Sequence, residues 1–155
     1  MSKQYFLILA TLFFISCGNN KAGQPGTDED TASADQIVYS WQATLNDSSG
    51  GLEMKKVENE GPDTLSPAAV VTYLNTTNSN VQLELVKTSG DTAYLKIPDA
   101  TFLTQQMGST GSMMYLATVV YNLTEIPGIK YVNCDFEVGD HAGPGTYSRE
   151  SFKND

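Results

Sequence analysis

The hydrophobic pattern along the chain predicts an α+β fold: a small mixed sheet with two helices packed on one face. The predicted order of elements is strand, strand, helix, strand, strand, helix, strand. Paired segments in which apolar and polar residues alternate predict the strands. Between them lie two segments with apolar residues three and four positions apart, which predict the helices. About 120 residues follow position 35, which is enough for one hydrophobic core.

The first elements are predicted to be two strands and a helix. Residues 37–45 and 52–58 form the strands, and the turn sequence Asn-Asp-Ser-Ser-Gly-Gly joins them. The helix begins after Ser66, a typical N-cap, because Pro67 suits a first helical position, where its missing N–H costs no hydrogen bond. The apolar face of this helix is expected to contain Ala69, Val70, Tyr73 and Leu74.

A hairpin, a second helix and a last strand follow. Apolar residues alternate through residues 81–98 on both sides of the turn sequence Thr-Ser-Gly-Asp, which predicts a hairpin. Residues 108–128 predict a helix that Ser109 caps and that Pro127 and Gly128 end. Its apolar face comprises Met113, Leu116, Ala117, Val120 and Leu123. The strand, in residues 129–138, places Val132, Cys134, Phe136 and Val138 on one face.

The N-terminus has the layout of a lipoprotein signal peptide, which covers residues 1–16. A lysine precedes an apolar run shorter than the ~20 residues of a membrane-spanning helix. The sequence Phe-Ile-Ser-Cys resembles the bacterial lipobox, which implies cleavage before Cys17 and attachment of acyl chains such as palmitate. Residues 17–35 are small, polar and acidic, and predict a flexible tether to a domain in residues 36–155. We therefore expect a membrane-anchored lipoprotein of the cell envelope that faces the periplasm or the cell exterior.

Charge and cysteine content narrow the possible partners. The formal charge is −9, and removal of Lys3 with the signal peptide makes it one unit more negative. Binding to nucleic acid is not expected, because it requires clustered Lys and Arg. Once Cys17 is acylated, Cys134 is a lone thiol, so no disulfide within the chain is expected. Its position in the last strand predicts a small buried apolar side chain.

The sequence from Tyr115 to Phe136 resembles the second half of the GerMN domain of sporulation and germination proteins. The resemblance rests on Asn-Leu-Thr-Glu at a helix end, Ile-Pro-Gly-Ile, and a strand beginning at Tyr131. The family hallmark is Thr-Leu-Thr followed by Pro-Gly-Val, and Asn122 replaces its first threonine. The match extends from Asp91 to about Phe136. The Leu-x-Gly-Pro segment that often follows the first helix is absent, and the chain continues past the usual last strand.

This resemblance implies a compact α+β unit, similar to the ring-building motifs of secretion and sporulation assemblies. Such domains occur in membrane-anchored proteins outside the cytoplasm. The resemblance brings no catalytic residue and no cofactor to this chain.

One group of residues could carry chemistry: Asp135, Glu137, Asp140 and His141. Carboxylates and an imidazole could bind a metal ion, and paired carboxylates could cleave a glycan. The alternative is a solvated strand end before a turn that Gly-Pro-Gly shapes, through positive φ at the glycines. Arg149 could bind a carboxylate or phosphate, or pair with an acidic side chain. The role of residues 139–149 stays open.

Tyr115, Tyr121 and Tyr131 could bind a small ligand, or belong to the core and its rim. The sequence contains no Gly-x-Ser-x-Gly, His-Glu-x-x-His or calcium-loop motif, and His141 is its only histidine. We therefore predict a non-enzymatic, lipid-anchored envelope protein without a cofactor. It is predicted to bind a protein or peptidoglycan partner, with a homo-oligomer as one form of this binding. The alternative is a metal-dependent or glycan-cleaving envelope enzyme that uses the acidic cluster around His141.

Overall fold

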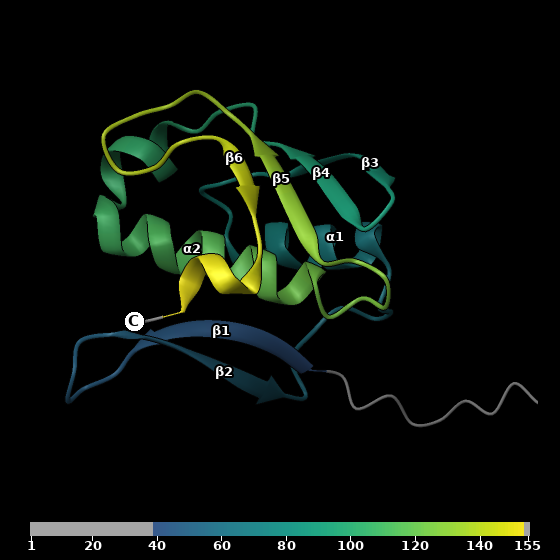
Figure 1. Cartoon of the computed structure of the whole chain (residues 1–155), viewed down its shortest axis with the longest axis horizontal. Coiled ribbons are helices and arrows are strands. Elements are labelled where there is room, and N and C mark those ends of the chain that lie inside the picture. Colours follow the sequence, from purple (N-terminus) through teal and green to yellow (C-terminus); the bar gives the residue numbers. More distant parts are fainter. Residues whose placement is uncertain (1–38, 154–155) are drawn as a thin grey trace, which may run out of the picture. The chain divides into compact units, whose positions relative to one another are not determined.

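The computed structural model describes residues 39–153, in which two α-helices lie between a four-stranded sheet and a two-stranded hairpin (Figure 1). The hairpin consists of β1 (Tyr39–Leu45) and β2 (Leu52–Glu58). The helices are α1 (Pro67–Thr77) and α2 (Gly108–Leu123). The sheet has the order β3-β4-β5-β6, formed by Glu84–Ser89, Thr92–Lys96, Tyr131–Asp135 and Gly145–Tyr147.

The four-stranded sheet is mixed, as predicted. β3 and β4 are antiparallel, β4 and β5 are parallel, and β5 and β6 are antiparallel. The parallel pair requires a long crossover, and α2 supplies it. The predicted α+β class is confirmed, although the hairpin β1–β2 forms a sheet of its own and β6 was not predicted. β6 has only three residues, too few to show an alternating pattern.

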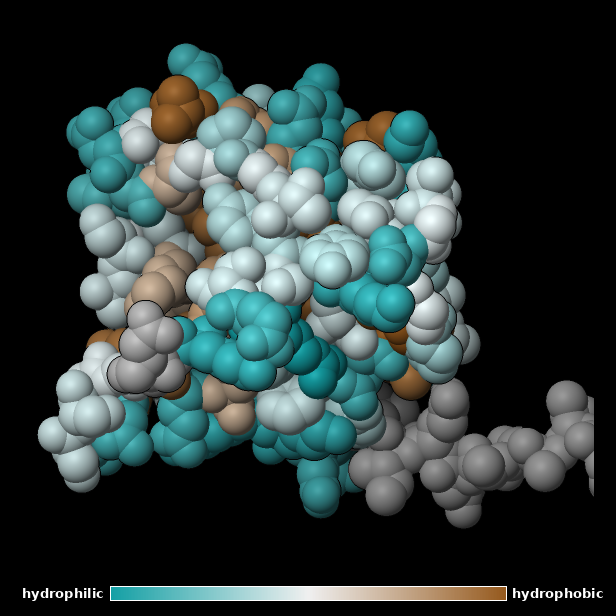
Figure 2. Space-filling model, viewed as in Figure 1, coloured by the Kyte–Doolittle hydropathy of each residue, from teal (hydrophilic) through white to brown (hydrophobic). Residues whose placement is uncertain are grey.

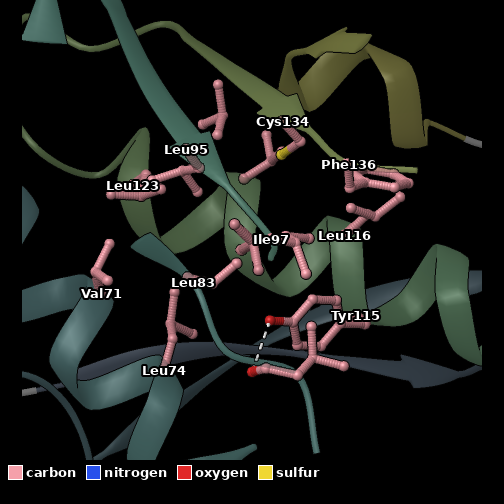
Figure 3. Packing of buried hydrophobic residues seen from close by; sticks show 14 of the residues in the cluster. Val71, Leu74, Leu83, Leu95, Ile97, Tyr115, Leu116, Leu123, Cys134 and Phe136 are labelled. Carbon is pink, nitrogen blue, oxygen red and sulfur yellow. Dashed lines mark hydrogen bonds between the residues drawn. The ribbon is translucent and has the colours of Figure 1, made fainter. Parts of the chain in front are cut away.

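The hydrophobic core lies between the four-stranded sheet and the two helices (Figure 3). It includes Leu74 of α1, Leu123 of α2, and Leu95 and Cys134 of the sheet, and each of the four is at most 1% exposed. Cys134 is thus buried, as expected, and burial raises the pKa of its thiol to about 12.

The start of α1 and the alternation of the β3–β4 hairpin are confirmed. The Ser66 hydroxyl accepts a hydrogen bond from the Ala69 amide at 3.3 Å, and Pro67 is the first helical residue. In α1, Val70 and Leu74 are buried, whereas Ala69 and Tyr73 are only partly buried. The strands are shorter than the predicted hairpin, and Leu85 is only half-buried, where a bulge interrupts β3. The other predicted inward residues are buried, whether in a strand or just outside it: Val81, Leu83, Ala93, Leu95 and Ile97.

Two predictions about α2 are wrong, although Leu116, Ala117, Val120 and Leu123 are buried as expected. Met113 is 39% exposed. Ser109 is not the N-cap, because α2 begins at Gly108 and Met107 holds the N-cap position, with no side chain bonded to the free amides there. A π-helical segment, η1 (Phe102–Gln106), precedes it. Gly108 has a φ of +73°, so the chain changes direction between η1 and α2 at a position that favours glycine. The helix α2 ends at Leu123, before Pro127, with the Thr124 hydroxyl donating to the Val120 carbonyl.

The last predicted strand is shorter than expected. β5 ends at Asp135, and Val138, which was placed on the buried face, is 69% exposed because the chain leaves the sheet after Phe136. A short 3₁₀ helix, η2 (Arg149–Phe152), follows β6. Among the described residues, no helix is both long and apolar enough to cross a membrane. The predicted signal peptide, Cys17 and the tether lie outside residues 39–153.

Candidate functional site

Glu125, two residues after the end of α2, is the centre of a polar cluster that joins three segments of the chain. Its carboxylate accepts hydrogen bonds from the Tyr39 hydroxyl, from Trp41 Nε1 at 2.9 Å and from Arg149 Nη2 at 2.6 Å. Lys56 Nζ lies 3.7 Å from the carboxylate. We call these five residues the Glu125 cluster. Through it, the hairpin and η2 are both bound to the end of α2.

The cluster holds Glu125 in its ionised form. Burial by itself would raise the pKa of the carboxyl. The hydrogen bonds from Tyr39, Arg149 and Trp41, together with the charge of Lys56, outweigh burial and lower the pKa from 4.5 to about 2. The pKa of Tyr39 is raised, by burial and then by its bond to Glu125. A carboxyl group with this pKa is poorly suited to proton transfer near neutral pH.

Arg149 has hydrogen-bond partners at two of its three guanidinium nitrogens, Nε and Nη2. Nε donates to the Thr124 hydroxyl at 2.8 Å, and Nη2 donates to the Tyr121 carbonyl at 3.1 Å as well as to Glu125. Its guanidinium carbon lies 5.3 Å from the Trp41 ring centre and 4.9 Å from that of Tyr121, within cation–π range. Of the two roles considered for Arg149, the structure shows the ion pair with an acidic side chain.

Asn122 completes the attachment of the hairpin to α2. Its side-chain oxygen accepts a hydrogen bond from the Trp41 amide at 3.0 Å, and its side-chain nitrogen donates to the Trp41 carbonyl at 2.8 Å. The Thr118 hydroxyl accepts from the Ala43 amide at 3.2 Å. These side chains occupy the edge of β1 as a neighbouring strand would. Asn122 is only 4% exposed, so its amide needs these partners.

The predicted acidic cluster is spread out. Asp135, Glu137 and Asp140 are exposed, and His141 turns toward α2, with Nδ1 3.2 Å from the Ser109 hydroxyl. The His141 amide donates to the Thr104 carbonyl at 3.0 Å. Within residues 39–153, no three His, Cys, Asp or Glu side chains are placed so that they could share a metal ion.

The expected reason for the Gly-Pro-Gly sequence is wrong. Gly143 and Gly145 do not have positive φ. The constrained glycine in this segment is Gly139, where an added Cβ would lie 2.6 Å from Thr104 Cβ. Gly139 is therefore needed for close packing against η1.

The three tyrosines considered as ligand-binding residues have separate surroundings. Tyr115 is 5% exposed and belongs to the core. Tyr121 packs edge-on against Trp41, with ring centres 5.5 Å apart. Tyr131 is 41% exposed, at the start of β5.

A comparison with known protein families identifies the family of this chain. Residues 46–137 match the family model described as "Germane: Sporulation and spore germination". The chain belongs to this family. The match includes Lys56, Asn122 and Glu125, whereas Tyr39, Trp41 and Arg149 lie outside it. The flanks of this GerMN-type domain therefore bind to residues of the family motif.

One solved structure is similar: the tandem GerMN domains of the sporulation protein GerM from Bacillus subtilis. It is 18% identical, with a TM-score of 0.43, and the similarity covers 77% of this chain and 47% of the GerM chain. This chain thus spans about half the length of that structure. No curated protein matches.

Sequence reasoning did not find the Glu125 cluster as a unit. The sequence places Asn122, Thr124 and Glu125 in a family motif, and it gives no indication that Arg149 binds to them. A signal was present: Trp41 and Arg149 are the only tryptophan and the only arginine in the chain. Their contact joins segments that are far apart in the sequence, and no local pattern reports such a contact.

Proposed function

We propose that this protein is a lipid-anchored component of the cell envelope whose GerMN-type domain binds a protein or cell-wall partner and does not catalyse a reaction. One observation carries the non-catalytic part of this proposal. The polar side chains of the family motif, Asn122, Thr124 and Glu125, are all engaged in contacts within the chain. These side chains therefore stabilise the fold, and a partner would bind to other residues at the surface of the domain.

The anchor is the proposed role of Cys17. Acyl chains on Cys17 would each contribute about 0.8 kcal/mol of membrane attachment per buried CH₂ group. Electrostatic attraction would not replace them, because a formal charge of −9 is repelled by anionic headgroups.

Substitution of Cys17 tests the anchor. We expect Cys17→Ser to move the protein from the membrane fraction to the soluble fraction, measured by ultracentrifugation of lysed cells. Cys134→Ala is the matched control, since Cys134 is buried in the core, and this variant should stay with the membrane. Unchanged pelleting of Cys17→Ser would contradict lipid anchoring through this residue.

Crosslinking in intact cells tests the binding function. Mass spectrometry of the material attached to the full-length protein should identify either a second copy or a defined envelope component. The same experiment with Cys17→Ser should lose these products, because they depend on membrane location. Recovery of no specific product from the wild-type chain would count against a binding role.

A further inference from the structure

We infer that the outer face of the four-stranded sheet, which points away from α1 and α2, binds an N-acetylated glycan strand of the cell wall. This inference rests on the proposed function and deepens it, because it identifies the chemical class of the partner and the residues that contact it.

The alternation of the strands shows which side chains lie on this face. Leu95 of β4 and Cys134 of β5 belong to the core on the side of the helices. Successive side chains of a strand point to opposite faces, so Tyr94 and Asn133 point away from that core. The register of the sheet places one row of four such side chains across all four strands: Lys87, Tyr94, Asn133 and Thr146.

A hollow of about 410 Å³ lies on this face and is lined by Tyr94 and Asn133. Exposed Pro144, from the segment before β6, also lines it. At the bulge of β3, Val86 and Lys87 both line the hollow, although neighbours in a regular strand point to opposite faces. The bulge therefore explains why Val86, an apolar residue, is 61% exposed beside a polar row.

The polar side chains around the hollow are not used by the fold. Within residues 39–153, the Tyr94 hydroxyl and the Asp135 carboxylate have no hydrogen-bond or ion-pair partner. Asn133 donates to the Thr146 hydroxyl at 2.8 Å, which leaves its side-chain oxygen free to accept a hydrogen bond. Lys87 Nζ has a cation–π contact, 4.9 Å from the Tyr94 ring centre. Every buried side-chain nitrogen and oxygen of the described residues has a partner, so these free groups are open to solvent.

Two other hollows in the described part of the chain have polar groups that hold the fold together. The hollow between β1 and α1 is lined by Ser40, which accepts a hydrogen bond from the Tyr73 hydroxyl. The hollow beside η2 is lined by Thr124 and Arg149, which bond to each other. At the outer face of the sheet, by contrast, the polar groups are available to a ligand.

The chemistry of this hollow fits a sugar with an acetamido group. A pyranose ring has C–H faces that pack against aromatic and aliphatic side chains, and hydroxyl groups that exchange hydrogen bonds with carboxylate, ammonium and amide groups. The acetamido N–H would donate to the free side-chain oxygen of Asn133, and its methyl group would contact Val86 or Pro144. Tyr131, on the same side of β5 and 41% exposed, extends the face for a further sugar unit.

Charge favours an uncharged glycan over an anionic polymer. The formal charge of −9 repels an anionic polymer. On the side of the domain seen in Figure 2, the described residues form a mainly hydrophilic surface, with hydrophobic residues in small separate patches. Large apolar patches mark many protein interfaces, so this surface fits a polar ligand better. The strands add no net charge to the outer face, where they place two lysines and two carboxylates: Lys87, Lys96, Glu84 and Asp135.

Titration with short glycans tests the ligand. The full-length chain, in a detergent without a sugar headgroup, is titrated with the hexamer of N-acetylglucosamine while its backbone amide signals are followed by NMR. We expect saturable shifts at Tyr94 and Asn133. Cellohexaose, the glucose hexamer with the same linkage and no acetamido group, should bind at least tenfold more weakly. Equal binding of the two hexamers would overturn the acetamido assignment.

Substitutions test the site. Asn133→Ala and Lys87→Ala should each weaken binding of the N-acetylglucosamine hexamer at least fivefold, without a change in thermal unfolding. Lys55→Ala on β2 is the matched control, because it removes the same charge from the other sheet, and it should bind as the wild type does.

The outcomes separate the site from the proposed function. If the wild-type chain binds the hexamer and both variants bind it equally well, the outer face is overturned and cell-wall binding stands. If the wild-type chain binds neither the hexamer nor insoluble peptidoglycan, the glycan inference is overturned, whereas binding to a protein partner is judged separately by crosslinking in cells.

Discussion

At the scale of single residues, Glu125 shows how a polar residue of the family motif can stabilise the fold. Its side chain is only 21% exposed and its carboxylate is charged, which would be unfavourable without partners. Donors from β1 and η2, with Lys56 nearby, compensate for this burial. The residue therefore links the two flanks of the domain through one charge.

Glu125→Gln should lower the free energy of unfolding by about 1–3 kcal/mol, because a neutral amide accepts weaker hydrogen bonds from Arg149 and Trp41. Because the folded-state pKa is about 2 and the ordinary value is 4.5, the stabilisation is complete above pH 4.5 and is lost as the pH falls toward 2. Urea unfolding at several pH values should show this acid-dependent loss in the wild type and much less of it in Glu125→Gln.

The control for this experiment is Glu150→Gln, since Glu150 is 73% exposed and its ion pair with Lys153 is at the surface. We expect it to change the free energy of unfolding by less than about 0.5 kcal/mol. Equal effects of the two substitutions would contradict the role assigned to Glu125.

Cys134 should be inert in the folded protein. Burial raises the pKa of its thiol to about 12, so almost no reactive thiolate forms at neutral pH. In a Cys17→Ser background, we expect no reaction with a thiol reagent until urea unfolds the domain. Adding Val138→Cys supplies the control, because Val138 is 69% exposed and a thiol there should react at once. Rapid labelling of Cys134 in the native state would show that the core opens.

At the scale of elements, the attachment of the hairpin determines much of the architecture. A two-stranded hairpin has little stability alone in water. Here Asn122 and Thr118 bond the edge of β1, and the Glu125 cluster holds its first residues. The hairpin was predicted as two strands, but the sequence pattern could not show that helix side chains, and not a third strand, would occupy its edge.

Asn122→Ala should loosen the hairpin locally. Loss of both bonds to the Trp41 backbone should speed hydrogen exchange of the Trp41 amide at least tenfold, while amides between β4 and β5 keep their protection. The matched control is Asn133→Ala, whose side chain bonds only to exposed Thr146 on the sheet. A uniform increase over all amides in Asn122→Ala would mean that the hairpin and sheet unfold together.

At the scale of the whole molecule, one core carries the stability of the described domain. Leu123 is fully buried at the end of α2, immediately before the residues that bind the flanks. Leu123→Ala should therefore cost about 2–5 kcal/mol, through lost apolar contact and the cavity left behind. Thermal unfolding checks this, with Leu45→Ala as the control, since Leu45 is 42% exposed. A small effect at Leu123 would show that the core adjusts around the gap.

The sequence by itself determined the α+β class, most element positions, the buried Cys134 and the resemblance to the GerMN domain. These properties follow from local patterns: the Ser66-Pro67 helix start, the alternation through residues 81–98, and the motif at the end of α2. Short-range geometry fixes such patterns, so they are visible in the order of residues.

The tertiary structure alone decided which polar residues meet. Trp41, Glu125 and Arg149 come from three distant segments, and their contact depends on how the hairpin and η2 dock against α2. Residues that are close in the sequence do not share a site, because the packing of the elements directs them differently. Asp135 and Glu137 lie at the surface, whereas His141 contacts Ser109. Side-chain partners across a fold are set by packing of whole elements, and periodicity along the chain contains no record of that packing.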